Sequence, residues 1–443
     1  MRWTKPLRYL QFSRQTQPKS LELNEALKSL CRSGRIIEAV DMLCGSKSQV
    51  DQQTYALLLQ ECIFRNEFNK GRRIHSHMIT TGFAPDEYLQ TKLVILYAKK
   101  ADLRTAHIVF DGIPNRSVVS WNAMMSGYVQ SGLEEVGLDL FYRMRLRGVN
   151  PDQFSFASVF RACASQATLE QGRRAHSVMI KCQIVNNVVV NSALMDMYFK
   201  CSSLGDARRV FDKALERNVV TWTALICGYG LHGRVEEVLE LFHRMIDWGF
   251  RPNYVTFLAV LSACSHAGMV NEGWQYFYLM TRDYGIRPRA KHYATMVDLL
   301  GRAGKLYEAY EFVRNSPCEK YSVVWGALLG ASRNFGDLEL VKVAAQKFFE
   351  LDPTNAGKHV VISNTYASFG LWENVKEARE GMRTFRVKKE PACSWIEVQK
   401  KVHMFLVGDK FHKESEQICE ALQDLTCVLK DAGYVPDISR FDQ

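Results

Sequence analysis

Apolar residues recur at helical spacing in two short stretches within one segment, and the pattern returns along the chain. In 118–152 the first stretch is Val119, Trp121, Met124, Met125 and Tyr128, and the second is Val136, Leu138, Leu140, Phe141 and Met144. This spacing places each set on one face of a helix. A glycine turn at 131–132 separates the stretches, and Gly148 and Pro151 follow the second, where they favour a helix end. Each such segment therefore predicts two helices.

The two-helix segment is an internal repeat. The segment at 118–152 returns 101 residues later at 219–253, and the segments between follow a long, long, short order. We place nine repeats at 20–51, 52–86, 87–117, 118–152, 153–187, 188–218, 219–253, 254–289 and 290–321. One helix pair cannot bury its own apolar face, but stacked pairs can. The repeats predict an all-α fold, a right-handed α-solenoid of helix-turn-helix units whose apolar stripes form the core.

Several strings within the repeats carry a resemblance to a known family. They include VVSWNAMMSGY at 118–128, ALMDMYFKC at 193–201 and HYATMVDLLGRAG at 292–304. Their amino-acid sequences and the long, long, short order of the repeats resemble plant pentatricopeptide repeat proteins of the PLS class. Tetratricopeptide repeats keep a constant length near 34 residues, so the alternating length disfavours them.

The C-terminal part of the chain extends this resemblance. Residues 322–389 resemble the family's E repeats, which are tetratricopeptide-like, and 390–443 resemble its E+ segment. In the latter, apolar runs at 395–398 and 402–407 flank a polar turn and precede a helix from about Ser415. These runs predict a short α+β C-terminal extension.

Charge is concentrated at the N-terminus. The chain has 57 Lys+Arg against 47 Asp+Glu, and residues 1–19 alone hold five basic residues and no acidic one. This composition predicts an organelle transit peptide, mitochondrial before chloroplastic, with a solvated basic tail as the alternative. Outside this segment the chain has only a small excess of basic over acidic residues, which argues only weakly for a polyanionic partner. We also expect no membrane span and, from twelve cysteines without a C-x-x-C pair, reduced thiols in a non-secreted protein.

No catalytic constellation stands out. Many PLS proteins continue into a DYW deaminase domain, whose zinc site needs the pattern H-x-E…P-C-x-x-C. The tripeptide H-K-E occurs at 412–414, but Cys419 and Cys427 after it are eight residues apart and cannot form the usual knuckle. His75 and His77 lie two apart on a predicted helix and point to different faces. We predict no enzyme, metal or cofactor.

The resemblance implies that the array binds single-stranded organellar RNA, one base per repeat, through the fifth and last residues of each repeat. The polar pairs are Asn24 with Asp51, Thr91 with Ser117, Asn122 with Asp152, Ser192 with Asn218, and Thr223 with Asn253. By the family's code Asn with Asp resembles a uridine reader, and Ser or Thr with Asn an adenosine reader. The Thr91 pair departs from the code and its preference stays open. Alternatively, the Asp and Asn residues only cap helices or form turns.

The second, fifth and eighth repeats have Ala56, Ala157 and Leu258 as fifth residues. Because these side chains cannot hydrogen-bond to a base, we expect those repeats to space or stack. Ala294 and Tyr321 of the ninth repeat are uninformative about a base. The hypothetical target is 5′-U-n-n-U-n-A-A-n-n, followed after about three nucleotides by an edited cytidine.

The resemblance therefore implies a site-recognition factor for C-to-U editing of organellar transcripts. Its expected partners are a DYW-type cytidine deaminase in trans and multiple organellar RNA-editing factors. An RNA stability, splicing or end-processing factor is the alternative, and a tetratricopeptide-type protein scaffold is less favoured.

Overall fold

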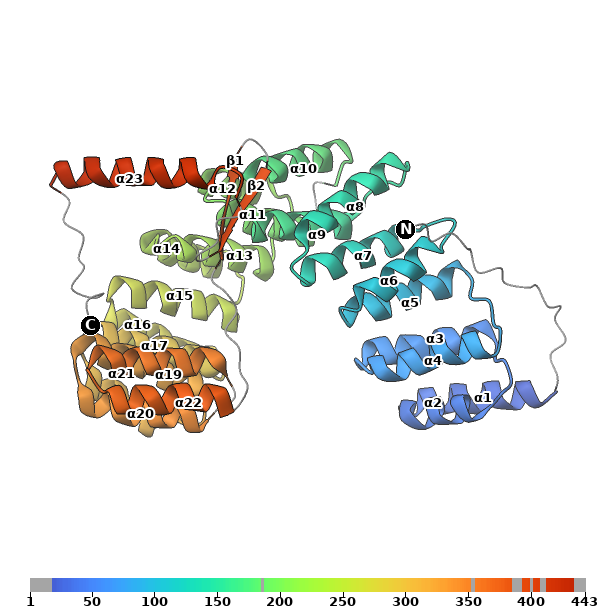
Figure 1. Ribbon diagram of the computed structural model, residues 1–443, viewed down its shortest axis with the longest axis horizontal. Coiled ribbons are helices and arrows are strands. Elements are labelled where there is room, and N and C mark those ends of the chain that lie inside the picture. The colour runs from blue at the N-terminus through green and yellow to red at the C-terminus, as the bar shows by residue number, and fades with distance from the viewer. Residues whose placement is uncertain are drawn as a thin grey trace. The chain divides into compact units, whose positions relative to one another are not determined.

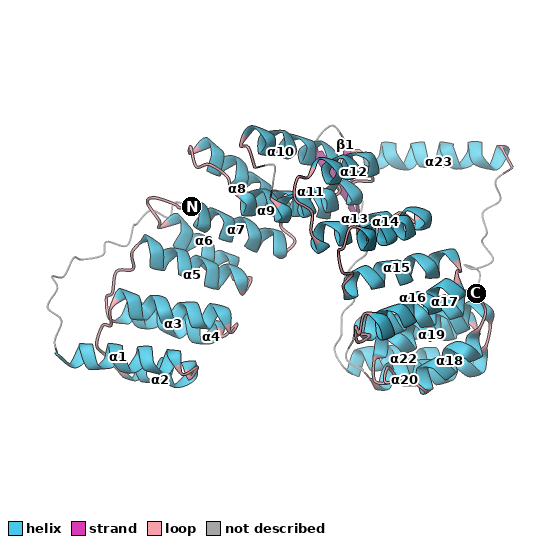
Figure 2. Ribbon diagram, turned by 180° about the vertical axis from the view of Figure 1, so that it is seen from behind, coloured by secondary structure: helices cyan, strands magenta, loops and turns pink. Residues whose placement is uncertain are grey.

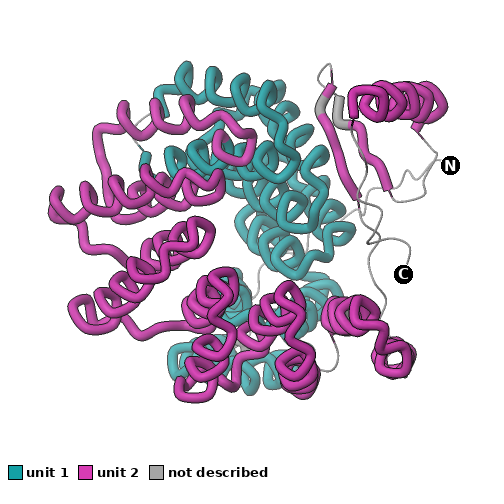
Figure 3. The backbone as a smooth tube through the Cα atoms, turned by 90° about the vertical axis from the view of Figure 1, so that its left-hand side faces the viewer, with its two compact units in different colours: residues 1–197 teal, residues 198–443 magenta. Residues whose placement is uncertain are grey.

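The computed structural model describes residues 18–184, 187–351, 355–384, 393–398, 401–406 and 412–433. Within these ranges the chain forms 23 α-helices, a short π-helix and one two-stranded sheet (Figures 1 and 2). It divides into two compact units, residues 1–197 and 198–443 (Figure 3). Of the expected transit peptide at 1–19, only the last two residues are described, as the start of the first helix.

The helices follow one another as hairpin pairs joined by short turns. In and just beyond the N-terminal unit they are α1 (Pro18–Arg32), α2 (Ile36–Gly45), α3 (Gln52–Phe64), α4 (Phe68–Thr80), α5 (Glu87–Lys99), α6 (Leu103–Asp111), α7 (Val118–Gln130), α8 (Glu134–Leu146), α9 (Gln153–Ser165), α10 (Leu169–Lys181) and α11 (Val188–Lys200). The C-terminal unit continues with α12 (Leu204–Lys213), α13 (Val219–Leu231), α14 (Val235–Asp247), α15 (Tyr254–Ala267), α16 (Val270–Tyr278), the π-helix η1 (Leu279–Asp283), α17 (Ala290–Arg302), α18 (Leu306–Arg314), α19 (Ser322–Phe335), α20 (Leu338–Glu350), α21 (Ala356–Ser368) and α22 (Trp372–Thr384).

The first helices of successive pairs pack side by side within each unit. In the N-terminal unit α1, α3, α5, α7 and α9 form such a row, and in the C-terminal unit α13, α15, α17 and α19 form another (Figure 1). Second helices pack against the following first helix, as α6 does on α7 and α14 on α15. This arrangement confirms the expected all-α solenoid of helix-turn-helix units.

A buried aromatic residue stands at the fourth position of seven first helices, α3, α7, α9, α13, α15, α17 and α19. These residues are Tyr55, Trp121, Phe156, Trp222, Phe257, Tyr293 and Trp325. Trp121 is 1% exposed and meets Phe110 of the preceding second helix edge to face, with 4.9 Å between ring centroids. Because the fourth residue is fixed in the core, the backbone of the fifth residue is held at a defined place in the first turn.

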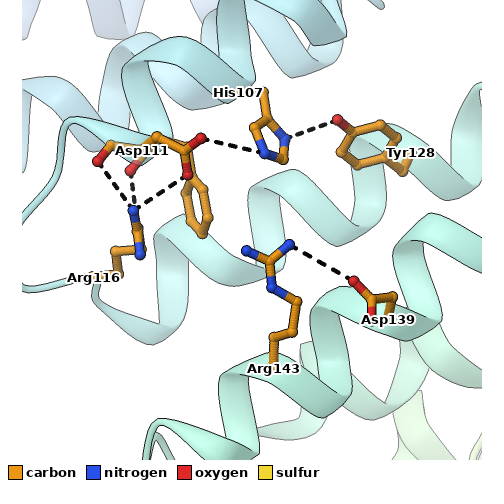
Figure 4. A network of polar contacts seen from close by, with 7 residues as sticks. His107, Asp111, Arg116, Tyr128, Asp139 and Arg143 are labelled. Carbon is orange, nitrogen blue, oxygen red and sulfur yellow. Dashed lines mark hydrogen bonds and ion pairs between the residues drawn. The ribbon is translucent and has the colours of Figure 1, made fainter. Parts of the chain in front are cut away.

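Histidine–tyrosine pairs join second helices to the next first helix. His107 Nδ1 lies 2.9 Å from the Tyr128 hydroxyl, and its Nε2 lies 3.5 Å from Asp111 Oδ2 (Figure 4). Arg116 binds the same carboxylate at 3.3 Å. One repeat earlier, His75 Nδ1 makes the equivalent contact with the Tyr97 hydroxyl at 2.8 Å. These polar contacts fasten neighbouring repeats beside the apolar core.

Among the glycines of the C-terminal unit, Gly228 of α13 leaves the least room for a side chain. A Cβ there would lie 2.1 Å from Phe199 Cδ2, whereas one at Gly230 would lie 3.8 Å from Val238 Cγ2. We expect Gly228→Ala to lower the free energy of unfolding by about 1 kcal/mol, since overpacking outweighs the gain in helix propensity. Gly230→Ala is the matched control and should be neutral or stabilising in urea unfolding followed by circular dichroism. Equal effects of the two variants would contradict the close approach.

The C-terminal extension contains a β-hairpin and one helix. Strands β1 (Cys393–Val398) and β2 (Lys401–Leu406) pair antiparallel, with Trp395 opposite Met404. Both of these side chains are exposed, and α23 (Ser415–Asp431) has no buried residue. The strands thus begin one or two residues earlier than the sequence predicted, and two residues of the predicted turn, 399–400, lie outside the described residues.

Candidate nucleic-acid interface

The last residue of each polar pair is the N-cap of the next first helix. Asp51, Ser117, Asp152, Asn218 and Asn253 precede α3, α7, α9, α13 and α15, and each accepts a hydrogen bond from a backbone N–H of the first turn. These residues therefore do cap helices, as the alternative interpretation expects. Capping occupies only part of each side chain, so the fifth residues decide what else the pairs can bind.

Asn122 and Asp152 lie together and share a third residue, Ser155 of α9. Asn122 Nδ2 donates to Asp152 Oδ1 at 2.8 Å, and the Ser155 hydroxyl donates to Asn122 Oδ1 at 2.6 Å. Ser155 also accepts from the Asp152 backbone N–H at 3.1 Å, which completes a capping box. We call Asn122, Asp152 and Ser155 the first triad. Because a carboxylate only accepts, Asp152 requires the nitrogen end of the Asn122 amide on its side, and the Ser155 hydroxyl holds the oxygen end.

The hydrogen bonds of the first triad leave a defined donor and acceptor. Oδ1 of Asp152 accepts from the backbone N–H groups of Phe154 and Ser155, each at 2.9 Å, and from Asn122. No described residue donates to Asp152 Oδ2, and one of the two hydrogens on Asn122 Nδ2 has no partner in the same part of the chain. An N–H donor therefore stands beside a carboxylate oxygen.

A second triad forms in the C-terminal unit from Thr223, Asn253 and Thr256. The two threonine hydroxyls are 2.8 Å apart, and Thr256 Oγ1 donates to Asn253 Oδ1 at 3.3 Å. Asn253 Oδ1 also accepts from the backbone N–H groups of Val255 and Thr256. Its oxygen is thus used by the cap, while no described residue accepts from its amide nitrogen. This triad presents an amide donor beside a hydroxyl oxygen.

The first pair is held differently. Asn24 Oδ1 accepts from the Asp51 backbone N–H at 3.0 Å, and Lys28 Nζ donates to Asp51 Oδ2 at 3.2 Å. Burial acts to raise the pKa of Asp51, but hydrogen bonds from Thr54 and the nearby Lys28 bring that pKa below its usual value. The carboxylate is therefore charged at neutral pH and already has a cationic partner.

The fifth residues of the two remaining pairs bind their own helices. Thr91 donates to Glu87 O and Ser192 to Val188 O, each at 2.8 Å. Ser117 is exposed and accepts from the Ser120 backbone N–H at 3.3 Å. Ser192 lies in the N-terminal unit and Asn218 in the C-terminal unit, where Asn218 makes a capping box with Thr221. In neither pair does the fifth residue join a triad.

Exposure differs between the two members of a pair. Asn24, Thr91 and Thr223 are buried, at 5%, 8% and 7% exposed, while their capping partners are half-buried or exposed. A base that approaches these pairs meets the capping residue first. Of the four apolar fifth residues, Ala157 is buried and Ala56, Leu258 and Ala294 are half-buried.

Sequence reasoning missed the third residue of each first helix. Ser155 and Thr256 join a pair from the preceding repeat, although they are 33 residues from Asn122 and Thr223. The available signal was the hydroxyl residue at the third place of five first helices: Thr54, Ser120, Ser155, Thr221 and Thr256. His292 of α17 occupies the same place, and its ring accepts from the backbone N–H of the N-cap residue, as the third residue of a capping box does.

His292 stabilises the start of α17 in its neutral form. Its Nε2 donates to Tyr254 O at 2.7 Å and its Nδ1 accepts from the Arg289 backbone N–H at 3.1 Å. Burial lowers the pKa of His292, although these hydrogen bonds act to raise it. The unfolded chain therefore binds this proton more readily, and the stabilisation present above about pH 6.5 is lost as the pH falls below it.

We expect His292→Thr to weaken this pH dependence, because threonine caps the equivalent place in α13 and α15 without titrating. Urea unfolding at about pH 7 and pH 5 should show a smaller loss of unfolding free energy in the variant than in the original chain. Some dependence should persist, since burial also lowers the pKa of His75. If the variant and the original chain lose the same unfolding free energy between pH 7 and pH 5, His292 is not a source of the pH dependence.

The other chemically suggestive residues have structural partners. His75 and His77 bond to different tyrosines, Tyr97 and Tyr55. His412 Nε2 lies 2.6 Å from His403 Nδ1 on β2, and within the described ranges no group of three His, Cys, Asp or Glu side chains is placed to hold a metal ion.

The thiols are also structural where they are buried. None of the twelve cysteines, all of which lie in the described ranges, is joined in a disulfide. Burial raises the pKa of four of them to about 11 or 12: Cys31, Cys62, Cys264 and Cys318. These four are protonated and are poor nucleophiles. No helix in the described parts of the chain is long and apolar enough to cross a membrane.

Family comparisons match both the repeats and the C-terminal region. The PPR repeat family model matches residues 116–165 and 217–266, which contain the two triads. A PPR repeat model matches 255–284, and an E motif model matches 335–397.

Curated relatives are similar over most of this chain. A pentatricopeptide repeat-containing protein of Arabidopsis thaliana is 54% identical over 426 residues, covering 96% of this chain and 85% of that protein. Two further Arabidopsis proteins of that description, one named mitochondrial and one chloroplastic, are 39% and 38% identical. They cover 91% and 87% of this chain, which spans 63% and 45% of their lengths.

Solved structures show the same fold at low sequence identity. The maize pentatricopeptide repeat protein PPR10 matches with a TM-score of 0.61 and 16% identity over 84% of this chain and 60% of that chain. PPR10 in complex with an 18-nt psaJ RNA element matches with a TM-score of 0.64 and 16% identity, over 84% and 56%.

Proposed function

The chain belongs to the pentatricopeptide repeat family, and from this premise we propose that it binds single-stranded organellar RNA and selects a site for C-to-U editing. The deaminase is supplied in trans, and multiple organellar RNA-editing factors assist at the repeats that do not read a base. The chain itself acts as a binding protein rather than an enzyme. This proposal joins RNA recognition by the repeats to recruitment by the C-terminal region.

The observation that carries RNA recognition is the geometry of the triads. In the first triad, the remaining Asn122 N–H can donate to a carbonyl oxygen of uracil while Asp152 Oδ2 accepts the uracil N3–H. Cytosine presents an unprotonated N3 to the carboxylate and is rejected. In the second triad, the Asn253 amide can donate to adenine N1 while the Thr223 oxygen accepts an adenine N6–H. Hydrogen bonds to Watson–Crick edges of unpaired bases are the usual basis of sequence-specific RNA recognition.

Three comparisons support the proposal. The E motif match covers residues 335–397, C-terminal to the nine repeats, where a recruiting segment is expected from the family resemblance. The matched structure with an RNA element is of a protein with the same fold, and curated relatives are named mitochondrial or chloroplastic. Editing in a mitochondrion or chloroplast is therefore favoured over a scaffold role.

The direct test of binding compares 5′-U-n-n-U-n-A-A-n-n RNA with a scrambled sequence of the same composition. Fluorescence anisotropy of purified full chain should show tighter binding to the first RNA, with affinity falling as salt rises. Equal binding to both RNAs would contradict sequence-specific recognition.

Editing is tested in a null mutant by sequencing organellar transcripts. We expect an unedited cytidine a few nucleotides downstream of a matching site. Altered transcript ends or retained introns with normal editing would instead show a processing or splicing role.

A further inference from the structure

An open groove of about 970 Å³ lies in the C-terminal unit where three first helices begin. Its lining includes Val219, Tyr254 and Ala290, the first residues of α13, α15 and α17. Asn253 of the second triad also lines it, so the groove is continuous with the proposed RNA surface. The repeats that form its far side, 254–289 and 290–321, have no polar fifth residue and cannot read a base by that route.

The groove is strongly basic. Arg251, Arg287 and Arg289 line it, all three are exposed, and its lining contains no carboxylate. None of the three forms an ion pair with the described residues. By contrast, Arg244 and Arg302 in the same unit bind carboxylates on their own helices, at 3.4 and 2.8 Å. The groove therefore keeps its positive charge available to an anion from outside the chain.

Aromatic rings accompany the arginines. Tyr254 is 40% exposed, and the Arg289 guanidinium lies 3.7 Å from the centroid of its ring. Arg251 donates to Tyr284 O at 2.8 Å, and half-buried Tyr321 also lines the groove. Basic side chains that follow a phosphate backbone, combined with rings on which bases stack, are the usual means of holding single-stranded nucleic acid without reading its sequence.

We propose that this groove holds the nucleotides immediately 3′ of the adenosine bound at Asn253, through arginine–phosphate and tyrosine–base contacts that do not depend on base identity. This inference rests on the proposed function and assigns a role to two repeats that have no reading pair. The groove would thus bind the RNA between the last base-reading pair and the downstream cytidine.

The test measures binding of the full chain to the predicted RNA across a series of salt concentrations. Arg287→Gln should make the dependence of log affinity on log salt shallower by about 0.7, the value for one phosphate contact on a single strand. Tyr254→Leu should leave this slope unchanged and weaken binding about tenfold. The matched control is Arg282→Gln: Arg282 also lies over a tyrosine ring, that of Tyr278 at 4.6 Å, but outside the groove. It should leave both the slope and the affinity unchanged.

An RNA with abasic sites at the two nucleotides after the adenosines adds a second readout. The original chain should bind it about as weakly as Tyr254→Leu binds intact RNA, and the two losses should not add. Additive losses would overturn base stacking on Tyr254. If Arg287→Gln and Tyr254→Leu both behave like Arg282→Gln, the groove is not an RNA site, although recognition by the triads would stand. If the original chain binds the scrambled RNA as tightly as the predicted RNA, the proposed function itself is refuted.

An acidic peptide is the competing occupant of a basic groove. A polyglutamate peptide that displaces RNA from the original chain, but not from Arg287→Gln, at concentrations comparable to a non-target RNA would overturn the assignment in favour of a protein partner. Failure of the peptide to compete is the result that we expect.

Discussion

Replacing Asn122 by alanine is expected to reduce the preference for uridine over cytidine at the nucleotide matched to repeat 118–152 by about 10- to 100-fold. The variant loses the amide N–H that stands beside Asp152 Oδ2 and keeps the helix cap, because Asp152 Oδ1 still accepts from Phe154 N and Ser155 N. Anisotropy titrations with RNAs that carry each of the four bases at this one nucleotide measure the effect.

The adenosines assigned to Ser192 and Thr223 provide an internal control for this variant. Preference at those two nucleotides should be unchanged, because their reading pairs lie in other repeats. An unchanged preference for uridine would refute the assignment of Asn122 to this base. An equal loss of preference at every nucleotide would indicate damage to the fold rather than to one contact.

Ser155→Ala is expected to lower discrimination at the same nucleotide by about tenfold, although Ser155 need not touch RNA. The Ser155 hydroxyl donates to Asn122 Oδ1 at 2.6 Å and accepts from Asp152 N at 3.1 Å, so its loss removes the donor that holds the amide oxygen and leaves the amide less firmly placed beside the carboxylate. Helix α9 also loses half of its capping box, which should cost about 1 kcal/mol of stability. Base preference and urea unfolding are measured on the same preparations.

Ser120→Ala separates positioning from stability. Ser120 stands at the third place of α7 and donates to Ser117 O, while Thr91 of the preceding repeat bonds to Glu87 O on its own helix. This control should lose similar stability and keep its preference for uridine at the nucleotide matched to repeat 118–152. Ser155→Thr should restore discrimination, since Thr256 performs the same task in the second triad. If Ser155→Ala and Ser120→Ala have the same base preferences, Ser155 has no positioning role.

Much of the fold was accessible from the sequence because its determinants are local and repeated. Apolar spacing set the helix faces, and the Asp, Asn and Ser residues before the first helices cap them as their side-chain chemistry favours. The hairpin at 393–406 was also predicted, with strand starts displaced by one or two residues. Such features depend on residues within a few positions of one another, which one chain displays directly.

The grouping of side chains from different repeats was not accessible in the same way. Thr91 and Thr223 occupy the same place in their helices, yet the first bonds to its own helix and the second to Thr256 of the next repeat. A hydroxyl has several acceptors within reach, and the choice depends on how closely the neighbouring helix approaches. The sequence identified both threonines but could not assign these different partners.

By itself, therefore, the sequence determined the helix pairs, their order and which polar residues stand at the helix starts, because short-range spacing and capping specify them. Only the tertiary structure decided that Ser155 and Thr256 complete the two triads and that Arg251, Arg287 and Tyr254 face one groove. Ser155 lies 33 residues from Asn122, Thr256 lies 33 residues from Thr223, and Arg287 lies 36 residues from Arg251. Only the stacking of successive helix pairs brings such residues within reach of one another.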